Sequence, residues 1–224
     1  MTPRMRAIVD FVDGADTAAD IGCDHGRISA ALIEKKRAKR VFACDISEQS
    51  LQKAKNIIAG RNITGITPLI SDGLGALEGK TVGCIIITGM GGLLIRDILA
   101  AGIGTAKKAN QLILGPQGNE YELRTFLYRN GFTIKDESIV KDAGHYYQVI
   151  AAAPGEGPPP QEVYLHFGYY PAMRREPLQK EFLQNRLREL ESIISRAKQG
   201  KDTQEYLAVK RRLRDQVMEV LRCL

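Results

Sequence analysis

The hydrophobic and polar positions of the chain alternate between two patterns over its first two thirds. Short apolar runs end in glycine, acidic or other polar residues, and stretches with apolar residues at helical spacing follow them. This alternation predicts βαβ units, and therefore a mainly parallel sheet with helices on its faces. The predicted strands are Thr17–Ile21, Arg40–Cys44, Ile66–Ile70, Val82–Thr88 and Gln111–Leu114. The predicted helices are Pro3–Val12, Gly26–Lys36, Glu48–Ala59, Leu93–Ala101 and Glu120–Asn130.

The pattern changes after Gly131. Two longer runs, Phe132–Val140 and His145–Ala153, flank the turn-forming segment Asp142–Gly144. They predict two antiparallel strands joined by a tight turn. This hairpin closes a sheet that is otherwise parallel.

A proline-rich segment at 154–160 cannot continue a strand or a helix, so it predicts a linker. The pattern beyond it is helical throughout. Apolar residues repeat in alternating steps of four and three, as in a coiled-coil seam, at Leu183, Leu187, Leu190, Ile194 and Ala197. After a break at Gln199–Lys201, a second amphipathic run carries Leu207, Leu213, Val217, Val220 and Leu224. We expect a domain at 1–153, the linker at 154–160 and a helical coiled-coil domain at 161–224.

Composition adds a weak indication of the partner. With 44% hydrophobic and 26% charged residues the chain is typical of a globular protein, and its net charge of +6 favours a polyanionic partner. The densest basic sites in the helical region are Arg174–Arg175 and Lys210–Arg214. They are either the solvated outer face of a coiled coil or contacts to RNA phosphates.

The cysteines and the chain start indicate a cytoplasmic protein. The four cysteines show no C-x-x-C spacing, which predicts reduced thiols and no metal site. The first sixteen residues are too charged for a secretory signal. The longest uncharged apolar stretch, Thr81–Ile95, is too short and too rich in glycine to span a bilayer, so we expect no membrane association.

The first candidate ligand-binding residues lie where the first predicted strand ends. The segment Asp20–Gly26 forms a turn there, and Asp45 follows the second strand, where an acidic residue can accept from ribose hydroxyls. The turn departs from the dinucleotide fingerprint, because Asp24 and Arg27 stand where glycines are required. Asp20 and Asp24 would repel a pyrophosphate, but they suit a cationic sulfonium. The pattern therefore favours S-adenosylmethionine over NAD.

Further loops should converge on the same crevice, because the carboxyl ends of parallel strands meet at one edge of a sheet. Ile46 would lie against an adenine face, and Asp72 before Gly73 could accept from the adenine amino group. Gly22 and Gly89 would let the backbone approach the ligand, and Met90 lies in the same loop as Gly89. Each feature has a purely structural alternative: Asp72 and Gly73 form a common turn, Gly89–Gly92 a tight turn, and Asp45 a helix cap. Their combined order and spacing favour a binding site.

These residues resemble the bacterial tRNA (adenine(22)-N1)-methyltransferases, a group of class I S-adenosylmethionine-dependent enzymes. The similarity extends from about Pro3 to the C-terminus. The matching segments are Asp20–His25, Asp45–Ile46, Asp72–Leu74, Gly89–Gly92, Leu112–Pro116, Leu123–Arg124, Gly131–Phe132 and Phe167–Gly168. The resemblance implies an α/β fold, with a Rossmann-like methyltransferase sheet and a C-terminal helical coiled-coil domain. It implies methyl transfer to N1 of adenine 22 in the D-arm of tRNA, with tRNA as partner.

Two residues follow from that resemblance as catalytic candidates. Asp24 would accept from the adenine N6 amino group and stabilise the positive charge that develops on the ring, and His25 would orient it. The chain departs from the family at Gly26 and Arg27, where Ala-Tyr is common, and at Gly115, where Gln is frequent. Two other functions remain open: methyl transfer to a small molecule or protein, and cofactor binding without turnover. The sequence does not indicate an oligomeric state.

Overall fold

The computed structural model describes residues 1–197 and 201–224. The chain divides into two compact units, Met1–Pro159 and Pro160–Leu224. Each unit is described by itself below.

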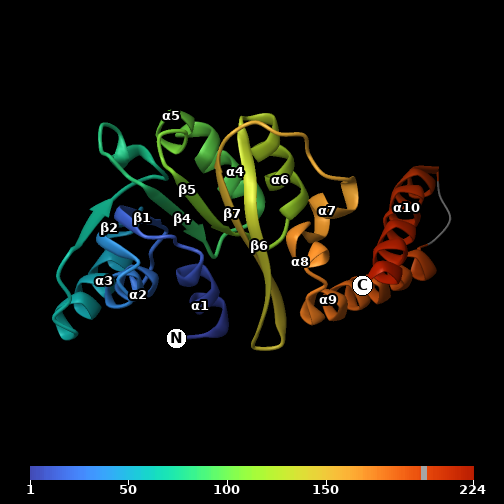
Figure 1. The fold of residues 1–224 in the computed structure, drawn as a ribbon, viewed down its shortest axis with the longest axis horizontal. Coiled ribbons are helices and arrows are strands. Elements are labelled where there is room, and N and C mark those ends of the chain that lie inside the picture. Colours follow the sequence, from blue (N-terminus) through green and yellow to red (C-terminus); the bar gives the residue numbers. More distant parts are fainter. Residues whose placement is uncertain (198–200) are drawn as a thin grey trace. The chain divides into compact units, whose positions relative to one another are not determined.

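The first unit contains one seven-stranded sheet, as predicted (Figure 1). Its strand order is β3-β2-β1-β4-β5-β7-β6, and the first five strands pair in parallel. β7 pairs antiparallel with both β5 and β6, which confirms the expected hairpin. The strands are β1 (Ala15–Ile21), β2 (Ala38–Asp45), β3 (Ile66–Ile70), β4 (Cys84–Thr88), β5 (Gln111–Gly115), β6 (Phe132–Asp142) and β7 (His145–Pro154).

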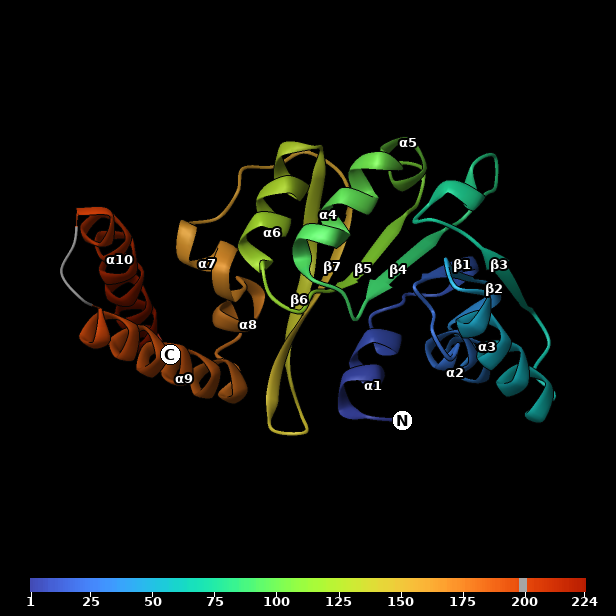
Figure 2. The ribbon, with the colours of Figure 1, turned by 180° about the vertical axis from the view of Figure 1, so that it is seen from behind.

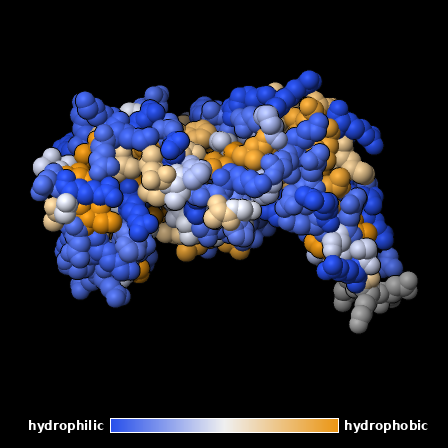
Figure 3. Space-filling model, turned by 90° about the horizontal axis from the view of Figure 1, so that it is seen from below, coloured by the Kyte–Doolittle hydropathy of each residue, from blue (hydrophilic) through white to orange (hydrophobic). Residues whose placement is uncertain are grey.

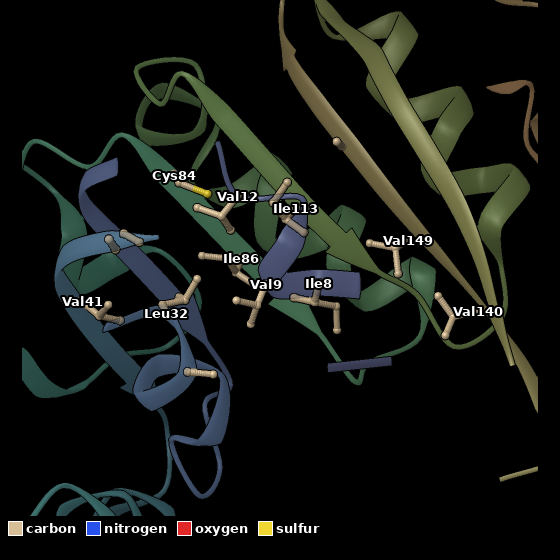
Figure 4. Packing of buried hydrophobic residues seen from close by; sticks show 14 residues of the cluster. Ile8, Val9, Val12, Leu32, Val41, Cys84, Ile86, Ile113, Val140 and Val149 are labelled. Atoms are coloured by element: carbon tan, nitrogen blue, oxygen red, sulfur yellow. The ribbon is translucent and has the colours of Figure 1, made fainter. Parts of the chain in front are cut away.

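Helices cover both faces of this sheet (Figures 1 and 2). They are α1 (Pro3–Asp10), α2 (Arg27–Glu34), α3 (Glu48–Gly60), α4 (Gly92–Ala101), α5 (Ile103–Ala106) and α6 (Glu120–Arg129). On one face, Val9 of α1 and Leu32 of α2 pack against Ile86, Ile113 and other strand residues (Figure 4). All four of these side chains are fully buried. The first helix is therefore part of the core.

The predicted helices and strands of this unit are all present, and their bounds differ by three residues or fewer. Two short elements were not predicted here, the 3₁₀ turn η1 (Gly75–Leu77) and α5. Both are too short for a hydrophobic period to be read from the sequence. They lie in the connections that follow β3 and α4.

The β6–β7 hairpin contains one extra residue. Ile134 pairs with Ala152, but Asp136 pairs with Ala151, so Lys135 has no partner across the ladder and forms a bulge. The bulge shifts the alternation of side chains along β6. Before the bulge, even-numbered residues such as Ile134 are buried. After the bulge, the odd-numbered residue Glu137 is buried instead.

A buried ion pair connects α6 to this hairpin. Arg124 Nε donates to Glu137 Oε1 at 2.7 Å, and Arg124 Nη2 donates to Gln148 Oε1 at 2.7 Å. The side chains of Arg124 and Glu137 are only 1% and 3% exposed. A guanidinium and a carboxylate at this depth are tolerable because each neutralises the other.

The second unit is helical. It comprises α7 (Glu162–Phe167), α8 (Tyr170–Met173), α9 (Pro177–Arg196) and α10 (Lys201–Cys223), of which the two short helices α7 and α8 were not predicted. The long helices pack on each other along the predicted apolar stripes. Leu183, Leu190, Leu207 and Val217 are among the buried residues of those stripes. Most of the expected break at Gln199–Lys201 lies outside the described residues.

Several of the basic residues singled out in this unit have acidic partners. Arg212 pairs with Glu162 at 2.8 Å, and Arg174 pairs with Glu176 at 2.8 Å. Lys210 lies over the Tyr206 ring, with Nζ 5.1 Å from its centroid. The Arg212 side chain is nonetheless 71% exposed, so it keeps access to solvent.

Hydrophilic side chains cover most of the surface seen from below, with hydrophobic residues in separate patches between them (Figure 3). Within the described residues, no helix combines the length and the apolar character that crossing a membrane requires.

Candidate functional site

A cavity of about 860 Å³ opens where the carboxyl ends of β1, β2, β3 and β4 meet. This volume lies within the range of about 300–1,000 Å³ typical of small-molecule sites. Nine of the ten predicted site residues line it, namely Gly22, Asp24, His25, Asp45, Ile46, Asp72, Gly73, Gly89 and Met90. We call the part around Asp45, Ile46 and Asp72 the Asp45 end. The part around Arg4, Asp142 and Tyr147 is called the Tyr147 end.

The Asp45 carboxylate is fixed by two backbone donors. Its Oδ2 accepts from the Asp24 amide at 3.0 Å, and its Oδ1 accepts from the Ser47 amide at 2.9 Å. Asp45 is only 9% exposed, so the carboxylate has little freedom to turn. Each carboxylate oxygen can accept a further hydrogen bond, which leaves the pair able to receive two neighbouring hydroxyls. Ile46, beside it, is 70% exposed and offers an apolar surface.

Backbone hydrogen bonds join the first three loops of the cavity. The Cys23 amide donates to the Cys44 carbonyl at 2.9 Å, and the Ser71 amide donates to the Asp45 carbonyl at 3.0 Å. Ser71 Oγ donates to the Gly73 carbonyl at 2.8 Å, which shapes the turn that presents Asp72. The loops that follow β1, β2 and β3 therefore form one connected wall.

Two glycines with positive φ shape this wall. Gly22 adopts a φ of +69°, and a Cβ there would collide with Met90 Cε. Gly89 adopts a φ of +83°, and a Cβ there would lie 3.8 Å from Arg4 Nη2. Both conformations favour glycine. The Met90 side chain lies over the Gly22 backbone, whereas Gly89 leaves its backbone open towards the cavity.

Asp20 is the one predicted site residue that does not line the cavity. It is 2% exposed, and its Oδ2 accepts from the Ser29 amide at 3.1 Å and from Ser29 Oγ at 2.7 Å. Burial raises the pKa of this carboxyl to about 6, although the hydrogen bonds from Ser29 act in the opposite direction. Asp20 lies behind the wall, where it connects β1 to the start of α2.

Asp24 occupies the turn between β1 and α2 in a left-handed conformation, with a φ of +47°. Its side chain is 61% exposed and faces two basic groups. Asp24 Oδ2 lies 3.4 Å from His25 Nε2, and Asp24 Oδ1 lies 3.8 Å from Lys53 Nζ. The structure therefore brings together the two predicted catalytic candidates at the mouth of the cavity.

The Tyr147 end was not predicted from the sequence. The Arg4 guanidinium carbon lies 4.5 Å from the centroid of the Tyr147 ring, and the Arg4 amide donates to Asp142 Oδ2 at 3.4 Å. These contacts join residues that are more than 130 positions apart in the chain. A pattern of neighbouring residues cannot reveal such a pairing. The turn at Asp142–Gly144 was the only local signal, and it predicted a hairpin rather than a site.

The buried thiols do not supply a nucleophile. Burial raises the pKa of Cys44 to about 12, and it also raises the pKa of Cys23, which lines the cavity. Both groups stay protonated near neutral pH. Within the described parts of the chain, no cluster of three or more His, Cys, Asp or Glu side chains could hold a metal ion.

The sequence is similar to those of known methyltransferases. Residues 1–150 match the family model described as "Methyltransferase domain". The tRNA (adenine(22)-N(1))-methyltransferase of Bacillus subtilis is 27% identical over 157 residues, which is 70% of this chain and 66% of that protein. MG248 of Mycoplasma genitalium, provisionally described as a tRNA methyltransferase, is 32% identical over 154 residues, 67% of this chain and 68% of that protein.

Structural similarity extends further along the chain. Sp1610 of Streptococcus pneumoniae, crystallised in complex with S-adenosyl-L-methionine, covers 99% of both chains with a TM-score of 0.89 and 27% identity. The agreement therefore includes both the sheet and the C-terminal helices. The chain belongs to the methyltransferase domain family, and within it to the class I tRNA (adenine(22)-N1)-methyltransferase group that its sequence resembles.

Proposed function

We propose that this protein transfers a methyl group from S-adenosylmethionine to N1 of adenine 22 in the D-arm of tRNA, and that it acts in the cytoplasm. The observation that carries the proposal is a single cavity with two kinds of groups. It contains a fixed carboxylate with free acceptor positions, Asp45, and an exposed carboxylate, Asp24, at its mouth. The Bacillus subtilis relative is named for this reaction.

The residues at the Asp45 end fit S-adenosylmethionine. Asp45 would receive the two ribose hydroxyls, and the exposed Ile46 side chain would lie against the adenine. Asp72 would accept from the adenine amino group, and Gly89 leaves its backbone open beside the cofactor. When bound, the cofactor supplies an electrophilic methyl carbon on a sulfonium.

Asp24 and His25 are the proposed catalytic residues. Adenine N1 carries a free lone pair, so the chain need not remove a proton from it. Asp24 would accept from the N6 amino group and stabilise the positive charge that develops on the ring. His25 Nε2, 3.4 Å from Asp24 Oδ2, would hold the carboxylate in position. The remaining contribution is the placement of the base, which the rigid wall of loops provides.

The substrate imposes a further requirement. N1 lies on the Watson–Crick edge, so an adenine in a paired arm must leave its helix, which costs a few kcal/mol. Basic residues would hold the tRNA while this happens. In the helical unit we assign this role to Arg212 and its neighbours, whose exposed side chains can exchange carboxylate partners for phosphates.

The proposal is tested with radiolabelled S-adenosylmethionine and unmodified tRNA transcripts, which are digested to nucleosides after reaction. We expect label in 1-methyladenosine, lost when adenine 22 is replaced. Label on a protein or a small molecule, with none on tRNA, would overturn the assignment of the substrate.

The variant Asp24→Ala separates binding from catalysis. We expect it to bind the cofactor like the wild-type protein and to lose methyl transfer. The matched control is Asp16→Ala, because Asp16 is also an exposed, paired aspartate of this unit but lies away from the cavity. Equal loss of cofactor binding and transfer in Asp24→Ala would make Asp24 a cofactor or structural residue.

A further inference from the structure

The Tyr147 end of the cavity lies beyond the strands that hold the cofactor residues. In the strand order β3-β2-β1-β4-β5-β7-β6, the proposed cofactor residues follow β1, β2, β3 and β4. Tyr147 lies on β7, two strands past β4. A methyl acceptor must approach from the side away from the rest of the donor molecule. The Tyr147 end of the same cavity is therefore the place where an acceptor base fits.

We propose that Tyr147 is the residue on which the extruded target base stacks, with Arg4 as the residue that positions it. The inference rests on the proposed function, which it deepens by naming the contact that holds the base. Flipped and unpaired bases are commonly held between aromatic and apolar side chains or on guanidinium planes. The Arg4–Tyr147 pair offers both kinds of surface at one point of the cavity.

The composition of the cavity supports this role. Among the described residues that line it, Tyr147 is the only tyrosine or phenylalanine. His25 in the turn after β1 and Arg27 at the start of α2 add polar groups to the lining of the same cavity. Tyr147 is half-buried, so part of its ring is accessible from the cavity. An adenine that enters here therefore meets one aromatic ring suited to stacking.

Arg4 is held so that it can fix the ring. Its guanidinium carbon lies 4.5 Å from the ring centroid, and its amide donates to Asp142 Oδ2 at 3.4 Å. When the Gln117 side-chain amide is oriented with its oxygen towards Arg4, that oxygen accepts from Arg4 Nη1 at 2.9 Å and from Arg4 Nη2 at 3.3 Å. These contacts come from β7, from the end of β6 and from the loop between β5 and α6. They restrict Arg4, and Arg4 in turn restricts the Tyr147 ring.

The decisive variant is Tyr147→Leu, compared with Tyr147→Phe. Phenylalanine keeps the stacking surface and loses only the hydroxyl, whereas leucine removes the aromatic face. The matched control is Tyr146→Leu. Tyr146 precedes Tyr147 on β7, points to the other face of the strand and has its own cation contact from Lys141, 5.3 Å from the ring centroid. All variants are first compared by thermal melting and by cofactor affinity.

Two readouts test the proposal. In single-turnover methylation at saturating cofactor, we expect Tyr147→Leu to be slower by about 10- to 100-fold, as expected for the loss of one base–aromatic stack. Tyr147→Phe and Tyr146→Leu should match the wild-type rate. The second readout is binding without turnover, using tRNA with 2-aminopurine at the target position and S-adenosylhomocysteine. Its fluorescence in the Tyr147→Leu complex should differ from that of the wild type, and Tyr147→Phe should restore the wild-type signal.

Arg4→Lys tests the positioning role. Lysine keeps the charge but loses the planar group that stacks on the ring. We expect a rate between those of wild type and Tyr147→Leu, with Arg6→Lys, on the exposed side of α1, as the control.

The outcomes distinguish this inference from the proposed function. If the wild-type protein methylates tRNA but Tyr147→Leu gives the wild-type rate and fluorescence, the inference is wrong and the proposed function stands. If Tyr147→Phe is as slow as Tyr147→Leu, the hydroxyl matters and the stacking role is also wrong. If the wild type does not methylate tRNA, the proposed function fails first.

Discussion

The two ends of the cavity are built in different ways. The Asp45 end is made from loops that follow consecutive strands, and backbone amides hold its carboxylate in place. The Tyr147 end joins Arg4 of the first helix to residues of the last hairpin through side-chain contacts. The geometry of the Asp45 end depends on local turns, whereas that of the Tyr147 end depends on correct assembly of the whole sheet. We expect the two ends to respond differently to mutation.

The largest effect is expected where the hairpin is anchored. Arg124→Met leaves the Glu137 carboxylate buried without its guanidinium partner, which should lower the free energy of unfolding by about 3–5 kcal/mol. Urea unfolding of the full chain measures this. The control is Arg61→Met, whose ion pair with Glu34 is about half exposed and should contribute less than about 1 kcal/mol. Equal effects of the two substitutions would show that the buried pair does not anchor the hairpin.

Cofactor affinity should separate the two ends most clearly. Asp45→Ala removes an acceptor of the ribose hydroxyls and the partner of two backbone amides, so S-adenosylmethionine should bind at least about 100-fold more weakly. Tyr147→Leu should leave that affinity unchanged. Isothermal titration calorimetry measures both. A loss of similar size in both variants would contradict the division of the cavity into two ends.

Asp20 makes the free energy of unfolding depend on pH. Its folded-state pKa, about 6, lies above the ordinary value of 3.8. The folded protein therefore holds this proton more tightly than the unfolded chain. The contribution of protonated Asp20 to the free energy of unfolding is complete below about pH 4 and is lost as the pH rises through about 6. Asn cannot ionise, so between pH 4 and pH 7 the wild type should lose on the order of 2 to 3 kcal/mol relative to Asp20→Asn. Parallel pH profiles for the two proteins would contradict this.

The smallest expected effect concerns Gly22, over which the Met90 side chain lies. Gly22→Ala should destabilise the protein by about 1 to 2 kcal/mol because of its positive φ, and crowding by Met90 should add to this. Gly14→Ala is the matched control, since Gly14 has a φ of +60° with no neighbouring atom within 4 Å. Thermal melting of both variants isolates the crowding. A double variant with Met90→Ala should remove the difference between them.

The same contrast explains what the sequence could predict. The strands, the main helices and the Asp45 end follow from periodicity and from turns that end each strand, so residues such as Asp45 and Gly22 could be placed in advance. Asp20 belonged to the same motif, but its side chain turns into the interior towards Ser29, a direction that motif spacing does not specify. Arg4 and Tyr147 meet only in the folded protein. The short helices α7 and α8 carry no readable period of their own.

The bulge at Lys135 takes up one residue of β6 without changing the pairs on either side of it. Deleting Lys135 would leave Ile134 opposite Ala152 and Asp136 opposite Ala151 in a regular ladder, with Glu137 still facing Arg124. Deleting a residue between Glu137 and the tip of the hairpin would instead exchange the two faces of the strand beyond that point, and it would carry Asp142 away from Arg4. An exposed residue with no ladder partner thus marks a position where β6 can change its length while the core and the cavity keep their contacts.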